Sequence, residues 1–312
     1  MRIAITGGRG FLGGSFARYA AAAGHEVLGI SRSTQPDTDW PGLHVHADCS
    51  HSDLSAAFRT WRPEAVLHAA GSASVIDSLT DPLEDMRALT LTLANTLDGI
   101  RRAGIAPVLL FPSSAAIYGN PATLPVSEAG AVTPISPYGF HKAACELLAR
   151  EAAELTGLRV VICRFFSVYG PRQRRLLIWE LYRQLASDAA VVELQGTGSE
   201  TRDFLHIDDA CTALLSLALH AKRGTTVVNV ASGIEFSVSQ LAEEMKRLMD
   251  KDKMLMCHGS PRPGDPRHWA ADITRLRGLV PNWKPSPLAD GLAEIIASWD
   301  RQQTLPASRE NG

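Results

Sequence analysis

The sequence predicts an α/β fold with a doubly wound parallel sheet and a smaller C-terminal α/β subdomain. Short runs rich in aliphatic and β-branched residues alternate with longer stretches of helical periodicity, which is the pattern of βαβ units. A glycine-rich segment, TGGRGFLGG at 6–14, also stands between the first predicted strand and the first predicted helix. Because βαβ units place their strands parallel in one sheet, we expect helices on both faces of that sheet.

The elements follow one another in a regular order. Strands are predicted at 2–6, 26–30, 43–47, 65–69, 108–111 and 159–164. Helices are predicted between them at 11–23, 52–61, 82–103 and 138–156. In the later part of the chain, strands are predicted at 191–194, 227–230 and 254–256, and helices at 176–186, 208–220, 238–249 and 288–299. Proline and glycine mark loops at 261–266 and 281–287.

Composition argues against several classes of protein. The 312 residues carry 31 basic and 33 acidic side chains, a net charge of −2, without a long run of one sign, so neither a nucleic-acid nor a membrane partner is expected. The five cysteines are scattered without a C-x-x-C pair, which argues against a disulfide framework and favours a reducing, cytoplasmic location. Neither a signal peptide nor a membrane-spanning segment is expected, because MRIAITGG at 1–8 has no long apolar stretch and no run of about 18 apolar residues occurs.

Gly7, Gly10 and Gly13 have the G-x-x-G-x-x-G spacing of a dinucleotide-binding loop. Glycine allows the tight turn and the close approach of the backbone to a pyrophosphate, which then lies at the helix N-terminus. The same glycines could form an ordinary strand-to-helix turn. Their place between the first strand and the first helix favours a Rossmann-like dinucleotide site.

The end of the second predicted strand bears on the choice of cofactor. An NAD-binding protein usually has Asp or Glu there for the ribose 2′-hydroxyl, whereas this chain has Ser31, Arg32 and Ser33. A guanidinium flanked by hydroxyls can bind a 2′-phosphate, so NADP(H) is favoured and NAD(H) remains possible. Alternatively, Arg32 is a solvated loop residue. Asp48, after the third strand, could reach the adenine or cap the helix near Ser52.

Tyr138 and Lys142 stand four residues apart, which puts both side chains on one face of the predicted helix 138–156. An ammonium beside the phenol, together with positively charged oxidised nicotinamide, stabilises the phenolate and lowers the tyrosine pKa. Such a tyrosine can exchange a proton with a sugar hydroxyl or ketone. The alternative, a chance surface pair, is disfavoured by the dinucleotide loop and by the serines of SSAAIYG at 113–119.

These segments resemble the extended short-chain dehydrogenase/reductase family, in its NAD-dependent epimerase/dehydratase branch. The resemblance covers nearly the whole chain and includes VLHAAG at 66–71, RFFSVYGPR at 164–172, GTGSETRDFLHIDD at 196–209 and RPGDPRHWAAD at 262–272. With it we expect a dinucleotide-binding Rossmann domain over 1–165 and a substrate-binding subdomain over 166–302. Part of 202–232 is expected to return to the first domain, and 303–312 is expected to be a frayed tail.

The resemblance also implies roles for individual residues. Ser114, Tyr138 and Lys142 are the expected catalytic residues: Ser114 binds the reacting oxygen beside Tyr138, and Lys142 holds the nicotinamide ribose. The expected cofactor-binding residues are Gly7, Gly10, Phe11, Leu12, Gly13, Ser31, Arg32, Ser33, Asp48, Cys49, Ala69, Ala70, Gly71, Tyr138, Lys142, Phe165 and Val168. The expected substrate is a nucleotide-diphosphate sugar, bound by Ser114, Ser167, Arg202, Arg262 and Asp265. Of these, the arginines would pair with the diphosphate and Asp265 would bind the nucleotide ribose.

Ala115 and Ala116 narrow the reaction that the resemblance implies. In family members that remove water from the sugar, these positions resemble an Asp-Glu pair, and other members carry Glu or Cys at position 116. With alanine at both, hydride transfer at one carbon, C4, is expected. Arg32 favours an NADPH-dependent 4-keto-sugar reductase, and a 4-epimerase is the alternative. A catalytically idle dinucleotide sensor is disfavoured because all three catalytic residues are present.

Some positions depart from the family or leave a role open. Ser167 and Leu89 stand where the family usually has Asn. The segment 173–175, Gln-Arg-Arg, is basic for a helix start, so it is either a solvated turn, which we favour, or a contact for a charged sugar.

Two further expectations concern metal and assembly. His44, His46 and His206 lack a third ligand at a suitable spacing, so no metal is expected. Helices 82–103 and 138–156 carry more aliphatic residues than one sheet face needs, and the resemblance implies a homodimer through them.

Overall fold

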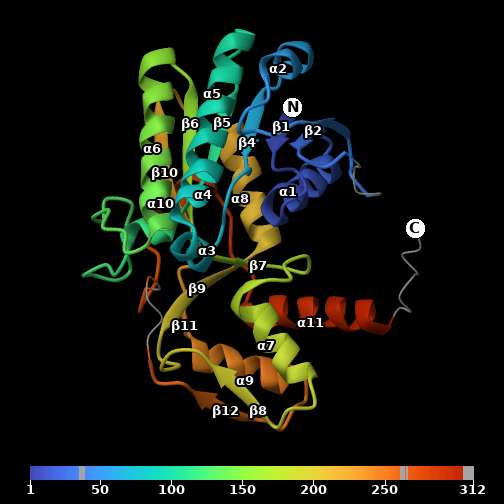
Figure 1. Ribbon diagram of the computed structural model, residues 1–312, viewed down its shortest axis with the longest axis vertical. Coiled ribbons are helices and arrows are strands. Elements are labelled where there is room, and N and C mark those ends of the chain that lie inside the picture. Colours follow the sequence, from blue (N-terminus) through green and yellow to red (C-terminus); the bar gives the residue numbers. More distant parts are fainter. Residues whose placement is uncertain (35–38, 261–263, 265, 305–312) are drawn as a thin grey trace.

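The structure is a computed structural model that describes residues 1–34, 39–260, 264 and 266–304. Seven parallel strands form its central sheet, in the order β10-β6-β5-β4-β1-β2-β3 (Figure 1). They are β1 (Arg2–Thr6), β2 (Glu26–Ser31), β3 (Leu43–His46), β4 (Ala65–His68), β5 (Val108–Ser114), β6 (Arg159–Phe165) and β10 (Thr225–Val230). The strand order reverses beside β1, and such a reversal opens a crevice at the carboxyl ends of the strands, where dinucleotides bind. The predicted doubly wound α/β fold is confirmed.

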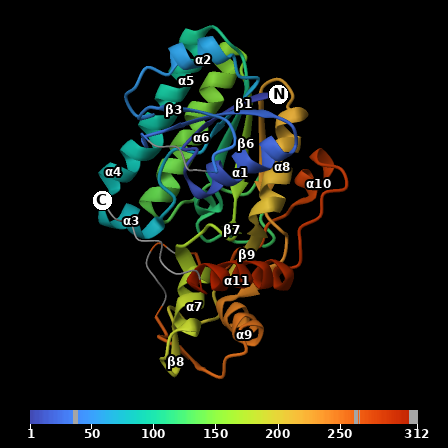
Figure 2. The same ribbon diagram turned by 90° about the vertical axis from the view of Figure 1, so that its right-hand side faces the viewer.

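Helices cover both faces of this sheet (Figure 2). One face carries α1 and α8, which pack against each other, and the other face carries α2, α5 and α6. Their bounds are α1 (Phe11–Ala22), α2 (Ser55–Trp61), α5 (Thr92–Ala103), α6 (Pro137–Thr156) and α8 (Ile207–Leu219). Strand side chains such as Ile5, Leu67 and Leu109 are fully buried between the two layers, as expected for a parallel sheet covered on both sides.

The remaining elements form a smaller part, drawn below the central sheet in Figure 1. It contains a three-stranded sheet, β11-β9-β7, and a two-stranded sheet, β12-β8. Its elements are β7 (Ser167–Tyr169), α7 (Leu176–Ala186), β8 (Val191–Leu194), β9 (Thr201–His206), β11 (Glu235–Ser237), α9 (Val238–Leu248), β12 (Met254–Cys257) and α11 (Leu288–Thr304). A second apolar core, which includes Tyr182, Leu241 and Trp299, joins them. Between β9 and β11 the chain returns to the central sheet as α8 and β10.

The helix predicted at 82–103 is divided in the structure. It consists of α4 (Pro82–Met86), a π-helical turn η1 (Arg87–Leu91) and α5, and it follows the short helix α3 (Val75–Thr80). Leu89 in η1 is buried and lies close to Gly71. A Cβ added to Gly71 would be 3.0 Å from Leu89 Cδ2. The wide turn therefore packs on the segment that leaves β4.

Other differences from the predicted elements have physical causes. β5 runs past the predicted 108–111 because residues 112–114 continue to pair with 163–165 of β6. The sequence pattern does not indicate β9, because its charged residues Arg202 and Asp203 are both buried. Two short helices, η2 (Ala115–Tyr118) and α10 (Thr274–Leu279), complete the described elements. Within the ranges given above, none of the helices has the length and apolar character needed to cross a bilayer.

Candidate active site

The glycine-rich loop lies at the carboxyl ends of β1, β2 and β4. Gly7 has a φ of +66°, and a Cβ there would lie 2.5 Å from the Ala69 carbonyl oxygen. A Cβ on Gly13 would lie 2.5 Å from the Gly7 carbonyl oxygen. Any larger residue at these two positions would force the backbones apart.

Helix α1 begins directly after this loop, with Gly10 at its N-cap. In the described part of the chain no side chain caps it, so its first amides are not used by a capping group. Phe11 and Leu12, on its first turn, are partly buried. An N-terminus of this kind is suited to bind a pyrophosphate.

Two hydroxyls and two guanidiniums gather at the end of β2. Ser31 Oγ is 2.8 Å from His44 Nε2, and Arg9 donates a hydrogen bond to Ser33 Oγ. Arg32 lies between these serines and is exposed. Arg9 was not expected at this site from the sequence, although an arginine between two glycines of the loop is a signal that could have indicated it.

Asp48 follows β3 and does not cap a helix. Its Oδ1 accepts hydrogen bonds from Ser50 N at 2.8 Å and Ser50 Oγ at 2.6 Å. These bonds, and to a smaller extent the charge of Arg32, hold the pKa of Asp48 below its usual value. The alternative that Asp48 caps the next helix is wrong, because α2 begins at Ser55, whose amide bonds to Asp53.

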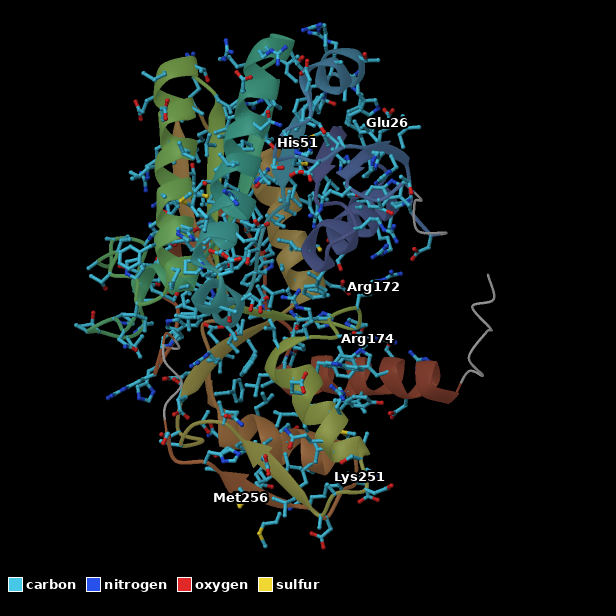
Figure 3. The ribbon with its side chains drawn as sticks, viewed as in Figure 1. Glu26, His51, Arg172, Arg174, Lys251 and Met256 are labelled. Carbon is cyan, nitrogen blue, oxygen red and sulfur yellow. The ribbon has the colours of Figure 1, made fainter. Side chains whose placement is uncertain are left out.

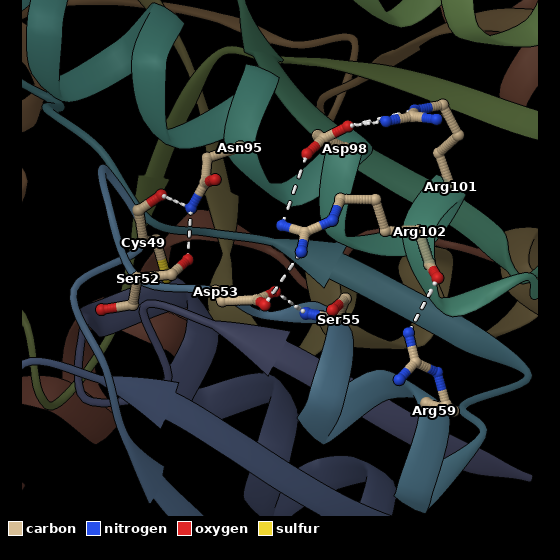
Figure 4. A network of polar contacts seen from close by, with 9 residues as sticks. All are labelled: Cys49, Ser52, Asp53, Ser55, Arg59, Asn95, Asp98, Arg101 and Arg102. Carbon is tan, nitrogen blue, oxygen red and sulfur yellow. Dashed lines mark hydrogen bonds and ion pairs between the residues drawn. The ribbon is translucent and has the colours of Figure 1, made fainter.

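The segment after β3 is fixed to α5 by the polar contacts drawn in Figure 4. Asn95 Nδ2 donates to the carbonyl oxygens of Cys49 and Ser52, at 3.0 and 2.8 Å, and Arg102 pairs with Asp53 at 3.1 Å. Burial raises the pKa of the Cys49 thiol to about 11, so this thiol is neutral at physiological pH.

The end of β4 forms the opposite wall of the loop. Ala69 N donates to the Thr6 carbonyl oxygen at 3.1 Å, and Ala70 N donates to Thr6 Oγ1 at 3.4 Å. Gly71 follows with a φ of +138°, a conformation that favours glycine. These expected cofactor residues thus lie beside Gly7, while Phe165 ends β6 in register with Ser114.

Ser114, Tyr138 and Lys142 come together between β5 and α6. Ser114 is the last residue of β5, and its side chain lies near enough to the Tyr138 phenol to act on its pKa. Lys142 Nζ lies 5.7 Å from the centre of the Tyr138 ring and donates to the Pro112 carbonyl oxygen at 2.7 Å. The structure therefore assembles the three residues that the sequence indicated.

The start of α6 is well defined, and this places Tyr138 in its first turn. Ser136 caps the helix by accepting a hydrogen bond from Gly139 N at 3.2 Å, and Pro137 occupies the first turn. Tyr138 N donates to Ser78 Oγ of α3 at 3.1 Å. The helix therefore begins against α3 at a fixed residue.

Burial dominates the protonation of both groups on α6. It raises the pKa of Tyr138 to about 12, although the side chain of Ser114 acts in the opposite direction. It also lowers the pKa of Lys142 to about 8. Desolvation of the phenolate dominates the pKa of Tyr138 in this structure, and the charge of Asp85 raises it further. The lowered pKa expected with oxidised nicotinamide beside the phenol stays a prediction.

A buried network lies behind these residues. Arg164 donates to both oxygens of Glu146, from Nε at 2.9 Å and from Nη2 at 2.8 Å, and Ser113 Oγ donates to Glu146 Oε1 at 2.6 Å. Arg164 Nη1 also donates to Tyr118 Oη at 2.9 Å. The network ties α6 to β5 and β6. Ser113 and Tyr118 lie in the SSAAIYG segment, but no sequence pattern indicated that they contact Glu146 and Arg164.

The expected substrate residues are only partly described. Ser167 lies on β7, which pairs with β9, the strand that carries Arg202. Arg202 Nη1 donates to the Thr201 carbonyl oxygen at 2.7 Å, and its guanidinium lies 5.3 Å from the centre of the Trp269 ring. Arg262 and Asp265 fall outside the described residues.

The basic segment 172–175 joins β7 to α7, where Figure 3 labels Arg172 and Arg174. Arg175 Nη2 is 3.9 Å from Asp77 Oδ2, and Arg174 lies 5.5 Å from the centre of the Trp179 ring. Arg172 pairs with Asp39. In the described part of the protein, no group of three His, Cys, Asp or Glu side chains could hold a metal ion.

A comparison with known families shows to which protein family the chain belongs. The sequence model of the NAD dependent epimerase/dehydratase family matches residues 3–231. The chain belongs to this family. The predicted family and the predicted enzyme class are thereby confirmed, and the glycine loop and the Ser114–Tyr138–Lys142 group lie within the matched residues.

Individual members of the NAD-dependent epimerase/dehydratase family are similar over the full length. A UDP-glucose 4-epimerase of Azospirillum brasilense is 30% identical over 96% of this chain and 92% of its own length. A GDP-6-deoxy-D-mannose reductase of Pseudomonas aeruginosa is 28% identical over 96% and 97%. The solved structure of MoeE5 in complex with UDP-glucose and NAD superposes with a TM-score of 0.89, at 28% identity over 97% of this chain and 100% of that one.

Proposed function

We propose that this chain is a nucleotide-sugar oxidoreductase that transfers hydride at the sugar C4, and that it acts as an NADPH-dependent 4-keto-sugar reductase. The observation that carries the proposal is the assembly of Ser114, Tyr138 and Lys142 at the carboxyl end of β5, in the same parallel sheet whose strand β1 leads into the glycine-rich loop. The names of its relatives include both epimerases and a reductase of nucleotide sugars. Ala115 and Ala116 are buried and offer no acid or base for removing water.

In the proposed mechanism Tyr138 donates its phenolic proton to the sugar O4, Ser114 orients that oxygen, and Lys142 holds the nicotinamide ribose. The reduced nicotinamide, when bound, supplies the hydride. With a pKa of about 12, the Tyr138 phenol is protonated at neutral pH, and a proton donor is what ketone reduction requires. This protonation state supports the reductase direction.

The alternative is a 4-epimerase, which the 30% identity to the A. brasilense UDP-glucose 4-epimerase favours. An epimerase first oxidises the C4 alcohol, so Tyr138 must begin as a proton acceptor. That role requires its pKa to fall from about 12, which a positively charged oxidised nicotinamide would promote.

We also propose that NADP(H) is preferred over NAD(H). Arg32 is exposed at the end of β2, and Arg9 reaches Ser33 across the same site, so two guanidiniums and a hydroxyl are available to a 2′-phosphate. Such contacts are charge-assisted and often bidentate. The segment 31–33 has no carboxylate to repel that phosphate.

Ser167 and Arg202 are proposed to bind the diphosphate region of the substrate. Their strands β7 and β9 are neighbours, and Ser167 comes two residues after Phe165, which pairs with Ser114. Arg262 and Asp265 keep their expected roles as predictions.

The decisive experiment uses a 4-keto nucleotide sugar and NADPH deuterated at its transferable position. A reductase oxidises NADPH in proportion to the substrate and places deuterium at C4. With a C4-hydroxy nucleotide sugar as substrate, interconversion of the two C4 epimers without net oxidation or reduction of the dinucleotide would assign the epimerase reaction instead. Mass spectrometry of the dinucleotide that copurifies provides an independent measurement, because a tightly held cofactor is expected for an epimerase and a free one for a reductase.

A homodimer through α4, α5 and α6 is proposed as well. Helices α4 and α5 both pack against α6. Large apolar side chains are exposed on α4 (Leu83 and Met86), on the turn η1 that joins it to α5 (Leu91) and on α6 (Phe140 and Leu147). Apolar surface shared by adjacent helices is suited to bury against a second copy of the same surface. Sedimentation of the purified chain as a monomer at micromolar concentration would contradict this proposal.

A further inference from the structure

Asp85 on α4 is a buried carboxylate that the proposed mechanism does not use. Its Oδ2 lies 2.6 Å from His141 Nδ1 on α6, and its side chain is 3% exposed. Its other oxygen, Oδ1, is buried without a hydrogen-bond partner among the described residues. A buried carboxylate with an unpaired oxygen is costly, so it calls for a compensating positive charge nearby.

The position of Asp85 places it next to the proposed catalytic pair. His141 directly precedes Lys142 in the chain, and α4 packs against α6. The charge of Asp85 acts on both Tyr138 and Lys142, and in each case it raises the pKa of the group. Asp85 is therefore electrostatically coupled to both members of the pair.

Cys145 and Glu146 also act to raise the pKa of Lys142, but neither supplies an unbalanced negative charge. Glu146 on α6 is held at both oxygens by Arg164. Burial raises the pKa of Cys145, also on α6, to about 11, which leaves it neutral. His68 on β4 is neutral too, because burial and the charge of Lys142 lower its pKa to about 3.

We propose that Asp85 is a positioning residue for the Tyr138–Lys142 pair: its carboxylate, held by His141, balances the charge of the buried Lys142 ammonium. Burial alone favours the neutral amine of Lys142. A nearby carboxylate opposes that loss of charge, so that the lysine remains a cation where the nicotinamide ribose is proposed to bind. The importance of this for turnover rests on the proposed function, but the charge balance itself can be measured without substrate or cofactor.

The test is competitive acetylation of the protein with acetic anhydride from neutral to alkaline pH, read at Lys142 by mass spectrometry. Exposed Lys222 serves as the internal standard. In the parent protein Lys142 should become half reactive near pH 8. In Asp85→Asn, which keeps the shape and removes the charge, this midpoint should fall by about 1 pH unit. An unchanged midpoint in a folded Asp85→Asn protein overturns the proposal.

Two variants separate charge from general disturbance of the helices. His141→Gln keeps the carboxylate and offers it an amide donor, so its midpoint should match that of the parent. A fall as large as in Asp85→Asn would overturn the proposal, because it would show that any change to the contact between Asp85 and His141 lowers the midpoint of Lys142. Asp98→Asn removes an exposed carboxylate of α5 and should have no effect on Lys142.

Asp85→Ser repeats the loss of charge if the asparagine variant does not fold, and its outcomes are judged in the same way. The labelling needs neither NADP(H) nor a sugar. It therefore tests the role of Asp85 separately from the proposed reductase function. A protein without reductase activity can still show the expected shift of the Lys142 midpoint, and a protein whose midpoint does not shift can still be a reductase.

Discussion

Adjacent serines at the end of β5 contact different turns of the same helix. Ser114 lies beside the phenol of Tyr138 in the first turn of α6, and Ser113 donates to Glu146 two turns later. One hydroxyl is proposed to bind the reacting oxygen, while the other helps to fix the helix that carries Tyr138, the proposed proton donor. The alanines at 115 and 116 add no further chemistry, which agrees with a reaction that needs only one proton and one hydride.

At this scale the first prediction is that Tyr138→Phe lowers turnover of a 4-keto nucleotide sugar by about 10² to 10⁴, because it removes the proton donor. Cofactor binding should change little, since the glycine loop is untouched. Ser114→Ala should cost less, because Ser114 only orients the oxygen. Steady-state rates together with calorimetric titration of NADPH measure both effects. Full activity of the Tyr138→Phe protein would contradict the mechanism.

The second prediction concerns Arg32. Arg32→Ala should weaken NADPH binding by about tenfold or more, because a charge-assisted hydrogen bond is worth about 1.5 to 3 kcal/mol. Binding of NADH should change little. Arg9→Ala should reduce the same preference, while Arg59→Ala, a loss of an arginine on α2, should not. Equal affinity of the parent protein for NADPH and NADH would show that the preference does not exist.

At the scale of elements, Asp203 joins β9 to the segment that follows β10. Its fully buried carboxylate accepts hydrogen bonds from Ser232 N and Ser232 Oγ at 2.7 Å, from Gly233 N at 2.9 Å and from Ala271 N at 3.2 Å. Burial nevertheless raises the pKa of Asp203 to about 6, because it outweighs these bonds. We therefore expect the contact between β9 and the segments at 232–233 and 271 to depend on pH.

The third prediction follows from the direction of that shift. The folded state holds the Asp203 proton more tightly than the unfolded state, whose aspartate pKa is about 3.9. The contribution to stability is complete below about pH 4 and is lost as the pH rises through about 6. A shift of two units corresponds to about 3 kcal/mol.

Urea unfolding of the parent and of Asp203→Asn across this pH range measures the contribution. The free energy of unfolding of the parent, relative to the variant, should decrease as the pH rises. A constant difference between the two proteins would show that Asp203 does not titrate in this range.

At the scale of the whole molecule, the doubly wound parallel sheet was predictable from the sequence and much of the site was not. Local periodicity indicates strands such as β1 and β5, and the spacing of Tyr138 and Lys142 places them on one helix face. Asp85 and His141 are 56 positions apart, and nothing in either local pattern pairs them. Arg164 and Glu146 are likewise joined only by the packing of α6 on β6. Buried polar contacts of this kind depend on tertiary structure, which a single sequence does not reveal.

The same helix, α6, contributes both to the site and to the proposed dimer surface. Tyr138 and Lys142 are buried toward β5, whereas Phe140 and Leu147 are 60% and 69% exposed. A partner copy on this surface would cover the apolar side chains and would hold α4 against α6. The catalytic pair would then be supported from behind by a second chain, so that assembly and activity would change together.

The last prediction tests that surface. Leu147→Arg should raise the dimer dissociation constant by about a hundredfold or more, because burying an unpaired charge at each copy of a two-fold interface costs several kcal/mol. Leu219→Arg, at an exposed leucine on the opposite face in α8, is the matched control and should leave assembly unchanged. Sedimentation velocity over a dilution series measures both. If the parent is a dimer and the Leu147→Arg protein sediments like it, the proposal is wrong, because the dimer must then form through a surface other than that of α6.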